Sequence, residues 1–308
     1  MEVDPATFVE ENLKEYIKIG INRLSLGGQS FDDNTLDAIG RKHSRSELIE
    51  ACSWINKLFV KGFLKSWSLD LIQNLPGLNL DKWKSELEQA VLTKAPHLSI
   101  YDLAIEPETV FGRRYKKGNL KIPSESIAIE VDSQTSKYLK SRGFSRYEIS
   151  SYSFPCHSSR HNRMYWSGSG WWGFGMGATS APWGERFSRP RTIASYKKWV
   201  EEQESQGLEK TLFLKGSRPM PLDELLMIGL RRREGVHFEE LATKYGWSQE
   251  KCNQRGKLLE KYWKVFLEKG LLIKNNGRFF LSDPKGMQIS NQILIQMFLW
   301  WDSLDRDQ

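Results

Sequence analysis

The strongest constraint on the fold is a regular alternation of short apolar segments with longer amphipathic ones in the first 150 residues. The apolar segments 66–72 and 97–105 have the pattern of strands, and the amphipathic segment 80–92 between them has the pattern of a helix. Strands joined through helices of this length pair in parallel, because each helix crosses back over the sheet. The sequence therefore predicts an α/β fold built on a parallel sheet.

Polar side chains stand at the ends of the predicted strands, at Glu2, Gln29, Asp70 and Glu106. In parallel sheets the ligand lies at the carboxyl ends of the strands. Strand ends are polar in most folds because they face solvent, so each residue alone is weak evidence. The four together predict a binding site at this rim of the sheet.

A second distinctive stretch, 147–180, contains the sequence HNRMYW at 161–166. A run of spaced glycines follows it: Gly168, Gly170, Gly173, Gly175 and Gly177. Glycine lets the backbone approach another group closely, and Trp166, Trp171 and Trp172 beside the run offer a flat aromatic wall for a large planar ligand. The alternative is a buried loop whose aromatic side chains fill the core, as most aromatic clusters do.

The character of the chain changes after about residue 190. Predicted helices are followed by a hairpin that turns at Asn275, Asn276 and Gly277, an order typical of a winged helix. We therefore divide the chain into domains 1–190 and 191–308. The charge pattern disfavours binding of nucleic acid by the second domain, because the arginines at 231–233 are interleaved with glutamates and no helix has a clean basic face.

Cysteine is scarce, with Cys52, Cys156 and Cys252 far apart in the chain. Such spacing gives no disulfide framework and suits a reducing compartment. It also cannot supply a clustered set of iron–sulfur ligands. The chain opens without a secretory signal, and its longest apolar run is too short to span a bilayer. We expect a soluble, cytoplasmic protein without a membrane span.

Several motifs form an ordered series along the chain: NRLSLGGQSF at 22–31, GRKH at 40–43, SLDLI at 68–72 and HNRMYW at 161–166. This series resembles the HemW-type haem chaperones, relatives of the oxygen-independent coproporphyrinogen III oxidases in the radical S-adenosylmethionine (SAM) superfamily. The resemblance covers essentially the whole chain. It implies a partial (β/α)6 radical SAM barrel followed by a C-terminal helical, winged-helix-like domain.

The resemblance also implies site residues. Those implied for SAM are Glu2, Gln29, Arg41 and Asp70, with Ala104 and Ala181 as looser candidates. Those implied for haem are His161, Asn162, Tyr165 and Trp166, with His161 as the iron ligand. Imidazole is a good ligand for haem iron, which agrees with this assignment. Packing or helix-end roles are the alternatives for Arg41, Asp70 and His161.

Two hallmarks of the family are absent: the C-x₃-C-x₂-C motif that holds a [4Fe–4S] cluster, and the glycine-rich GGGTP strand. We therefore expect an N-terminally truncated member that has no radical SAM activity. Loss of the first strands would leave an exposed sheet edge, which favours aggregation unless a partner covers it.

The first functional hypothesis is a haem-binding, chaperone-like protein that passes haem to acceptor proteins. The alternative is an oxygen-independent coproporphyrinogen III oxidase of porphyrin biosynthesis in full-length form, and a further alternative is a winged-helix nucleic-acid binder. Sequence alone leaves the choice between haem and a porphyrinogen open.

Overall fold

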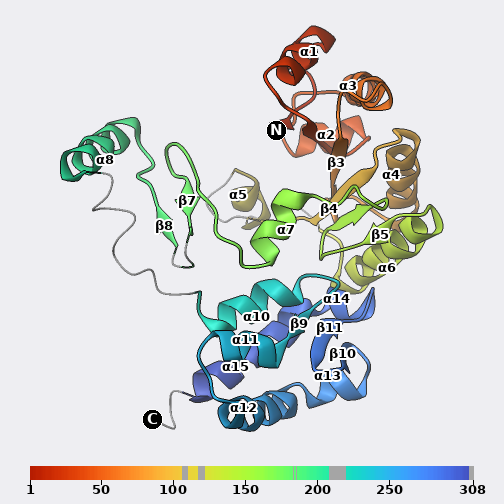
Figure 1. Ribbon diagram of the computed structural model, residues 1–308. Coiled ribbons are helices and arrows are strands. Elements are labelled where there is room, and N and C mark those ends of the chain that lie inside the picture. The colour runs from red at the N-terminus through yellow and green to blue at the C-terminus, as the bar shows by residue number, and fades with distance from the viewer. Residues whose placement is uncertain (106–109, 117–121, 183, 185, 208–219, 305–308) are drawn as a thin grey trace. The chain divides into compact units, whose positions relative to one another are not determined.

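The computed structural model describes residues 1–105, 110–116, 122–182, 184, 186–207 and 220–304 (Figure 1). The chain forms two compact units, one of residues 1–158 with 283–288, the other of residues 159–282 with 289–308. The segment 159–190 thus belongs to the second unit. The division into domains at residue 190 stays a prediction.

The first unit is the expected alternation of strands and helices. Its elements are β1 (Glu2–Val3), α1 (Glu10–Lys18), β2 (Arg23–Gln29), α2 (Asp33–Ala38), α3 (Arg45–Val60), β3 (Ser66–Gln73), α4 (Leu80–Leu92), β4 (His97–Asp102), α5 (Val110–Lys116), α6 (Glu125–Ser141), β5 (Ser145–Arg146), β6 (Ser151–Ser153) and α14 (Lys285–Gln288). Helix α4 has the predicted bounds, and an asparagine cap at its start satisfies the backbone N–H of Lys82.

The described strands of this unit form one sheet in the order β1-β2-β3-β4-β6-β5. Strands β1 to β4 pair in parallel, which confirms the predicted α/β sheet. The core on the sheet is apolar and includes the fully buried Trp67 and Trp83. Strand β1 lies at one end of this order, and the partner expected to cover an open edge stays a prediction.

The sequence pattern of residues 147–152 predicts a strand, and this prediction is wrong for the first half of the segment. Residues 149–150 form a bend between β5 and β6, and β6 pairs antiparallel with β4. The reason is local hydrogen bonding: the Ile149 carbonyl accepts from the Arg146 guanidinium, and the Ser150 N–H donates to Glu148. These bonds hold the chain in a turn where its apolar pattern alone indicates an extended strand.

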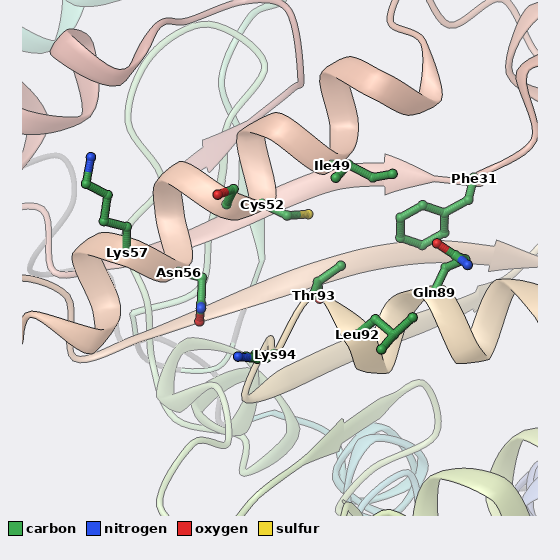
Figure 2. A pocket seen from close by; sticks show the side chains of 10 residues that line it. Phe31, Ile49, Cys52, Asn56, Lys57, Gln89, Leu92, Thr93 and Lys94 are labelled. Atoms are coloured by element: carbon green, nitrogen blue, oxygen red, sulfur yellow. The ribbon is translucent and has the colours of Figure 1, made fainter.

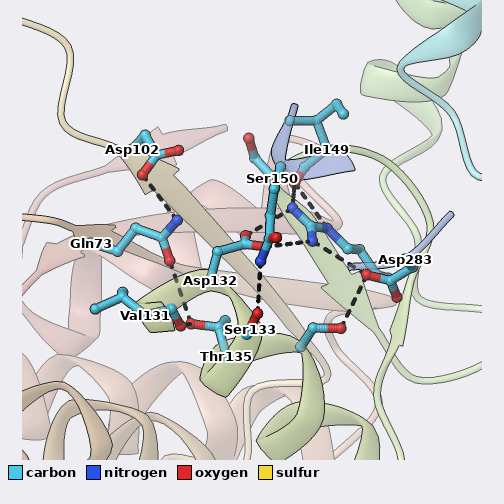
Figure 3. Close-up of polar contacts among 12 residues, drawn as sticks. Gln73, Asp102, Val131, Asp132, Ser133, Thr135, Ile149, Ser150 and Asp283 are labelled. Carbon is cyan, nitrogen blue, oxygen red and sulfur yellow. Dashed lines mark hydrogen bonds and ion pairs between the residues drawn. The ribbon is translucent and has the colours of Figure 1, made fainter. Parts of the chain in front are cut away.

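A buried ionic network joins α6 to the segment 283–288 (Figure 3). The Arg146 side chain, only 4% exposed, makes ion pairs with Asp132 at 3.0 Å and Asp283 at 3.3 Å. Asp283 also accepts from the Ser136 hydroxyl at 3.0 Å, and Gln288 donates to Ser133 at 2.8 Å. This segment is therefore part of the first unit although it lies far along the chain.

The second unit is mostly helical. Its elements are α7 (Arg160–Trp166), β7 (Thr179–Ser180), β8 (Phe187–Ser188), α8 (Ile193–Gln206), α10 (Leu222–Leu230), β9 (Val236–His237), α11 (Phe238–Lys244), α12 (Gln249–Tyr262), α13 (Lys264–Glu268), β10 (Leu272–Asn275), β11 (Arg278–Leu281) and α15 (Ser290–Leu304). The hairpin β10–β11 turns at Asn276 and Gly277, both with positive φ, and β9 adds a third strand.

The sequence pattern of residues 249–269 predicts a single helix, but the structure breaks it at Trp263, between α12 and α13. The Trp263 side chain is fully buried, and its indole N–H donates to the Ile293 carbonyl at 3.1 Å. Packing of this large ring against α15 thus outweighs the helical pattern of the segment. Among the described residues, no helix is both long and apolar enough to cross a membrane.

Candidate functional site

A cavity of about 450 Å³ lies where β1, β2 and β3 run side by side. It is lined by the four residues that the resemblance implies for SAM, namely Glu2, Gln29, Arg41 and Asp70. Neighbouring parallel strands bring them together, because Glu2 pairs with Ser25 on β2 and Asp70 pairs with Gly27 on the same strand. Alternate residues of β2 face this cavity.

The end of β2 is shaped by a break in the ladder between Gly27 and Gln29, where Gln29 adopts a φ of +65°. A Cβ at Gly27 would stand 2.6 Å from the Asp4 carboxylate, so any larger residue there would displace the Asp4 side chain. Asp4 in turn forms an ion pair with Arg41 at 2.8 Å. Sequence reasoning missed Asp4 and Ser25 as lining residues, although Asp4 lies in the same short motif as Glu2.

Asp70 is the most distinctive polar group of the cavity. Its Oδ2 accepts from the Ser25 hydroxyl at 2.8 Å, while Oδ1 lies buried without a partner of good geometry in the described part of the chain. Burial raises the pKa of Asp70, and the hydroxyl groups of Ser99 and Ser25 oppose that shift. A buried acceptor without a donor is costly, so a ligand that offers an N–H or O–H would be bound favourably here.

Two of the three other residues considered for this rim, Ala104 and Ala181, do not line the cavity. Ala104 is exposed beyond the end of β4 and is absent from the cavity lining. Ala181 is buried in the second unit, where its N–H donates to the Trp171 carbonyl at 3.0 Å. Glu106, the fourth polar strand-end residue, lies outside the described residues.

The HNRMYW motif forms helix α7, capped by Ser159, which accepts from the Asn162 N–H at 3.3 Å. His161 is exposed in the first turn, and its ring lies edge-on to Tyr165 at 4.8 Å between centroids. The ring centroid of Tyr165 in turn lies 4.9 Å from that of Trp171. Trp166 instead lies beneath the guanidinium of Arg231, 5.6 Å from its ring centre.

The glycine run packs mainly against its own chain. A Cβ at Gly170 would stand 2.2 Å from the Pro182 carbonyl oxygen, and a Cβ at Gly173 would stand 2.4 Å from that of Thr179. The predicted close backbone approach is therefore correct, but the glycines approach β7 and the residues that follow it. The loop is not a buried core filler either, since Phe174 is 86% exposed.

The cysteines do not fit an iron–sulfur cluster. Cys52 and Cys252 are buried in different units, and Cys156 is exposed. Burial raises the pKa of the Cys52 thiol to about 12, which disfavours the thiolate that binds metal. No trio of His, Cys, Asp or Glu side chains within the described residues is grouped so that it could hold a metal ion.

A second cavity, of about 480 Å³, lies between α3 and α4 (Figure 2). Phe31 stands at one end, and Lys57 and Lys94 stand at the other. No sequence pattern predicted it, because it is formed by two helices whose exposed faces look like ordinary surface. Lys57 is already paired with Glu10 at 2.7 Å, which leaves Lys94 as the lining cation without an ion pair in the described part of the chain.

Comparison with known proteins gives matches to one superfamily. The profile of the radical SAM superfamily matches residues 1–90. A heme chaperone HemW from Synechocystis sp. is 37% identical, over 97% of this chain and 73% of that protein. The heme chaperone HemW of Bacillus subtilis is 29% identical, over 95% of this chain and 74% of that protein.

Among solved structures, the radical SAM enzyme coproporphyrinogen III oxidase (HemN) of Escherichia coli superposes with a TM-score of 0.72, over 96% of this chain and 68% of that one. Sequence identity in that superposition is 16%, so the likeness establishes the fold alone. The expected α/β barrel architecture with additional helices is confirmed by this match.

Proposed function

This chain belongs to the heme chaperone HemW family of the radical SAM superfamily, and on that premise we propose that it binds haem and passes it to acceptor proteins. In this proposal His161 ligates the haem iron, and Asn162, Tyr165 and Trp166 support the site on α7. The cysteines give no reason to place the protein outside a reducing compartment, and we propose the cytoplasm.

The observation that carries the proposal is the exposed imidazole of His161 at the start of a row of aromatic rings. A structural histidine is normally engaged by hydrogen bonds, as His97 is with the Tyr147 hydroxyl at 2.8 Å. His161 has a ring contact with Tyr165, but within the described residues neither of its ring nitrogens forms a hydrogen bond. An imidazole displayed in this way is suited to bind iron, and an exposed site suits a ligand that must be handed on.

We further propose that the strand-end cavity binds SAM. The buried Oδ1 of Asp70 would accept from a hydroxyl or amino group of the nucleoside part, and Arg41 would attract the carboxylate end. Asp4 already pairs with Arg41, so that attraction is shared. Glu2 and Gln29 supply further acceptors and donors at the same cavity.

Titration with haemin tests the haem site. The wild-type chain is expected to shift the Soret band in a saturable way, and His161→Ala is expected to lose that shift. His157→Ala is the matched control, because this histidine hydrogen-bonds to the Ser66 hydroxyl at 3.0 Å and lies outside α7. Equal titrations for the wild type and His161→Ala would remove His161 from the site.

Calorimetric titration with SAM tests the cavity. Asp70→Asn is expected to weaken SAM binding about tenfold, the loss of one hydrogen bond to a charged group. Asp102→Asn is the control, since Asp102 accepts from Gln73 at 2.9 Å at the end of β4 and does not line the cavity. Equal affinities in both variants would show that Asp70 does not contact the ligand.

Neither the oxidase function nor nucleic-acid binding is favoured by a contact among the described residues. The likeness to the oxidase is one of fold, so it does not favour decarboxylation of a porphyrinogen. The arginines at 231–233 are the positive charges that could contact the phosphates of a nucleic acid. However, Arg231 lies over the Trp166 ring, and Arg232 donates to the Gly235 carbonyl at 3.2 Å. These contacts draw the guanidinium groups into the fold and away from a free basic face.

A further inference from the structure

We propose that Arg186 binds a propionate of haem, and that the macrocycle lies along a strip formed by His161, Tyr165, Trp171 and Arg186. We call this set the α7 strip. The inference rests on the proposed haem function and deepens it. It adds Trp171 and Arg186, which lie beyond the HNRMYW motif, to the proposed binding surface.

The α7 strip is continuous. The ring of His161 stands 4.8 Å from that of Tyr165, which stands 4.9 Å from that of Trp171. The guanidinium carbon of Arg186 then lies 5.7 Å from the Trp171 ring centre, a cation–π contact. An imidazole, two aromatic rings and a cation therefore follow one another through direct contacts within the second unit.

The order of these groups matches the chemistry of haem. Haem has iron at the centre of a flat apolar macrocycle and two carboxylates on one edge. Imidazole binds the iron, aromatic rings cover apolar area, and a guanidinium pairs with carboxylate through parallel hydrogen bonds. A neutral planar ligand would have no use for the cation at the end of the strip.

Arg186 is held in place and still accessible. Its Nη2 forms an ion pair with Glu224 of α10, and its side chain remains 45% exposed. A guanidinium has five N–H donors, so the pair with Glu224 leaves several for a second carboxylate. Because the Trp171 ring and Glu224 fix its position, less side-chain entropy is lost when a propionate binds.

Other arginines of this region are used differently. Arg189 is buried and donates to the Ser180 hydroxyl at 2.8 Å. Arg163 pairs with Glu234 at 2.5 Å. Arg160 is exposed and adjacent to His161 in the sequence, but it has no aromatic contact among the described residues. Arg160 is therefore the matched control for a non-specific effect of positive charge.

The experiment compares haemin with haemin dimethyl ester, whose propionates carry no charge. Both are titrated into the wild-type chain, Arg186→Gln and Arg160→Gln, with the Soret band as the readout. Arg186→Gln is expected to weaken haemin binding about tenfold, to leave the affinity for the diester unchanged and to keep the wild-type Soret position. Arg160→Gln is expected to bind both ligands as the wild type does.

Arg186→Lys provides a second test, because it keeps the charge without the paired donors. It is expected to bind haemin with an affinity between those of the wild type and Arg186→Gln. Equal haemin affinities in the wild type and Arg186→Gln, or an equal loss for haemin and the diester, would overturn the role of Arg186. A wild-type chain without a saturable Soret change would overturn the haem function itself, and this inference with it.

Discussion

Replacement of Arg146 by methionine is expected to destabilise the first unit severely. The side chain is 4% exposed and bonds to both oxygens of Asp132, at 3.0 and 3.2 Å. It also donates to the Ile149 carbonyl at 3.0 Å. Methionine fills much of the same volume but leaves these acceptors without a donor.

The size of the effect follows from what is left behind. The Asp132 side chain is 11% exposed, so after the substitution its charge is buried without a partner. Breaking a buried ion pair in this way costs about 3–5 kcal/mol of the free energy of unfolding. The pair of substitutions Arg146→Met and Asp132→Leu removes the arginine and its most buried partner, and it is expected to recover part of that loss, since Asp283 still loses its ion pair and the Ile149 carbonyl its donor.

Urea unfolding followed by circular dichroism measures these free energies. Hydrogen exchange in α6 identifies the unfolding transition that belongs to the first unit. Arg142→Met is the control, since Arg142 is exposed at the end of the same helix, and its effect is expected to stay within about 0.5 kcal/mol. Two results would refute the reasoning: a loss of less than about 1 kcal/mol in the free energy of unfolding for Arg146→Met, or a double variant that is less stable than Arg146→Met alone.

Three more predictions concern stability. Burial lowers the pKa of His97 from 6.5 to about 3, so the unfolded chain binds more protons between these values. The free energy of unfolding should therefore fall as the pH drops below 6.5, by about 2 kcal/mol at pH 5. In urea unfolding, His97→Gln should reduce this dependence of stability on pH. A variant with the same pH dependence as the wild type would contradict the assignment to His97. Gly170→Ala, whose Cβ would stand 2.2 Å from the Pro182 oxygen, should lower the melting temperature more than Gly175→Ala, which has open space but a φ of +87°. The reverse order would count against the close approach. Trp83→Phe removes a buried indole that donates to a threonine hydroxyl at 2.7 Å, and should lower the free energy of unfolding by about 2 kcal/mol; an unchanged urea midpoint would argue against that bond.

The sheet and the cavity were predictable because both follow from local patterns. Strand and helix periodicity placed α4 and the parallel strands. Once those strands pair, Gln29 and Asp70 must meet at one edge, since the carboxyl ends of parallel strands lie together. The roles of these residues in binding remain proposals.

The features that the sequence did not predict depend on contacts that local patterns do not encode. The glycine run predicted a close approach, but only the path of β7 decides that Gly170 meets Pro182. The bend at 149–150 depends on a side chain that donates back to the backbone. Ala181 was placed by a motif alignment that carries no information about burial, and it lies in the interior of the second unit.

The network around Arg146 also has a consequence for synthesis of the chain. Asp283 is 137 residues further along than Arg146, so at about 5–20 residues per second the ribosome delivers it roughly 7–27 seconds later. Asp132 precedes Arg146 by 14 residues and is already present when the arginine emerges. The nascent first unit can therefore neutralise its buried cation at once and add the segment 283–288 when translation reaches it.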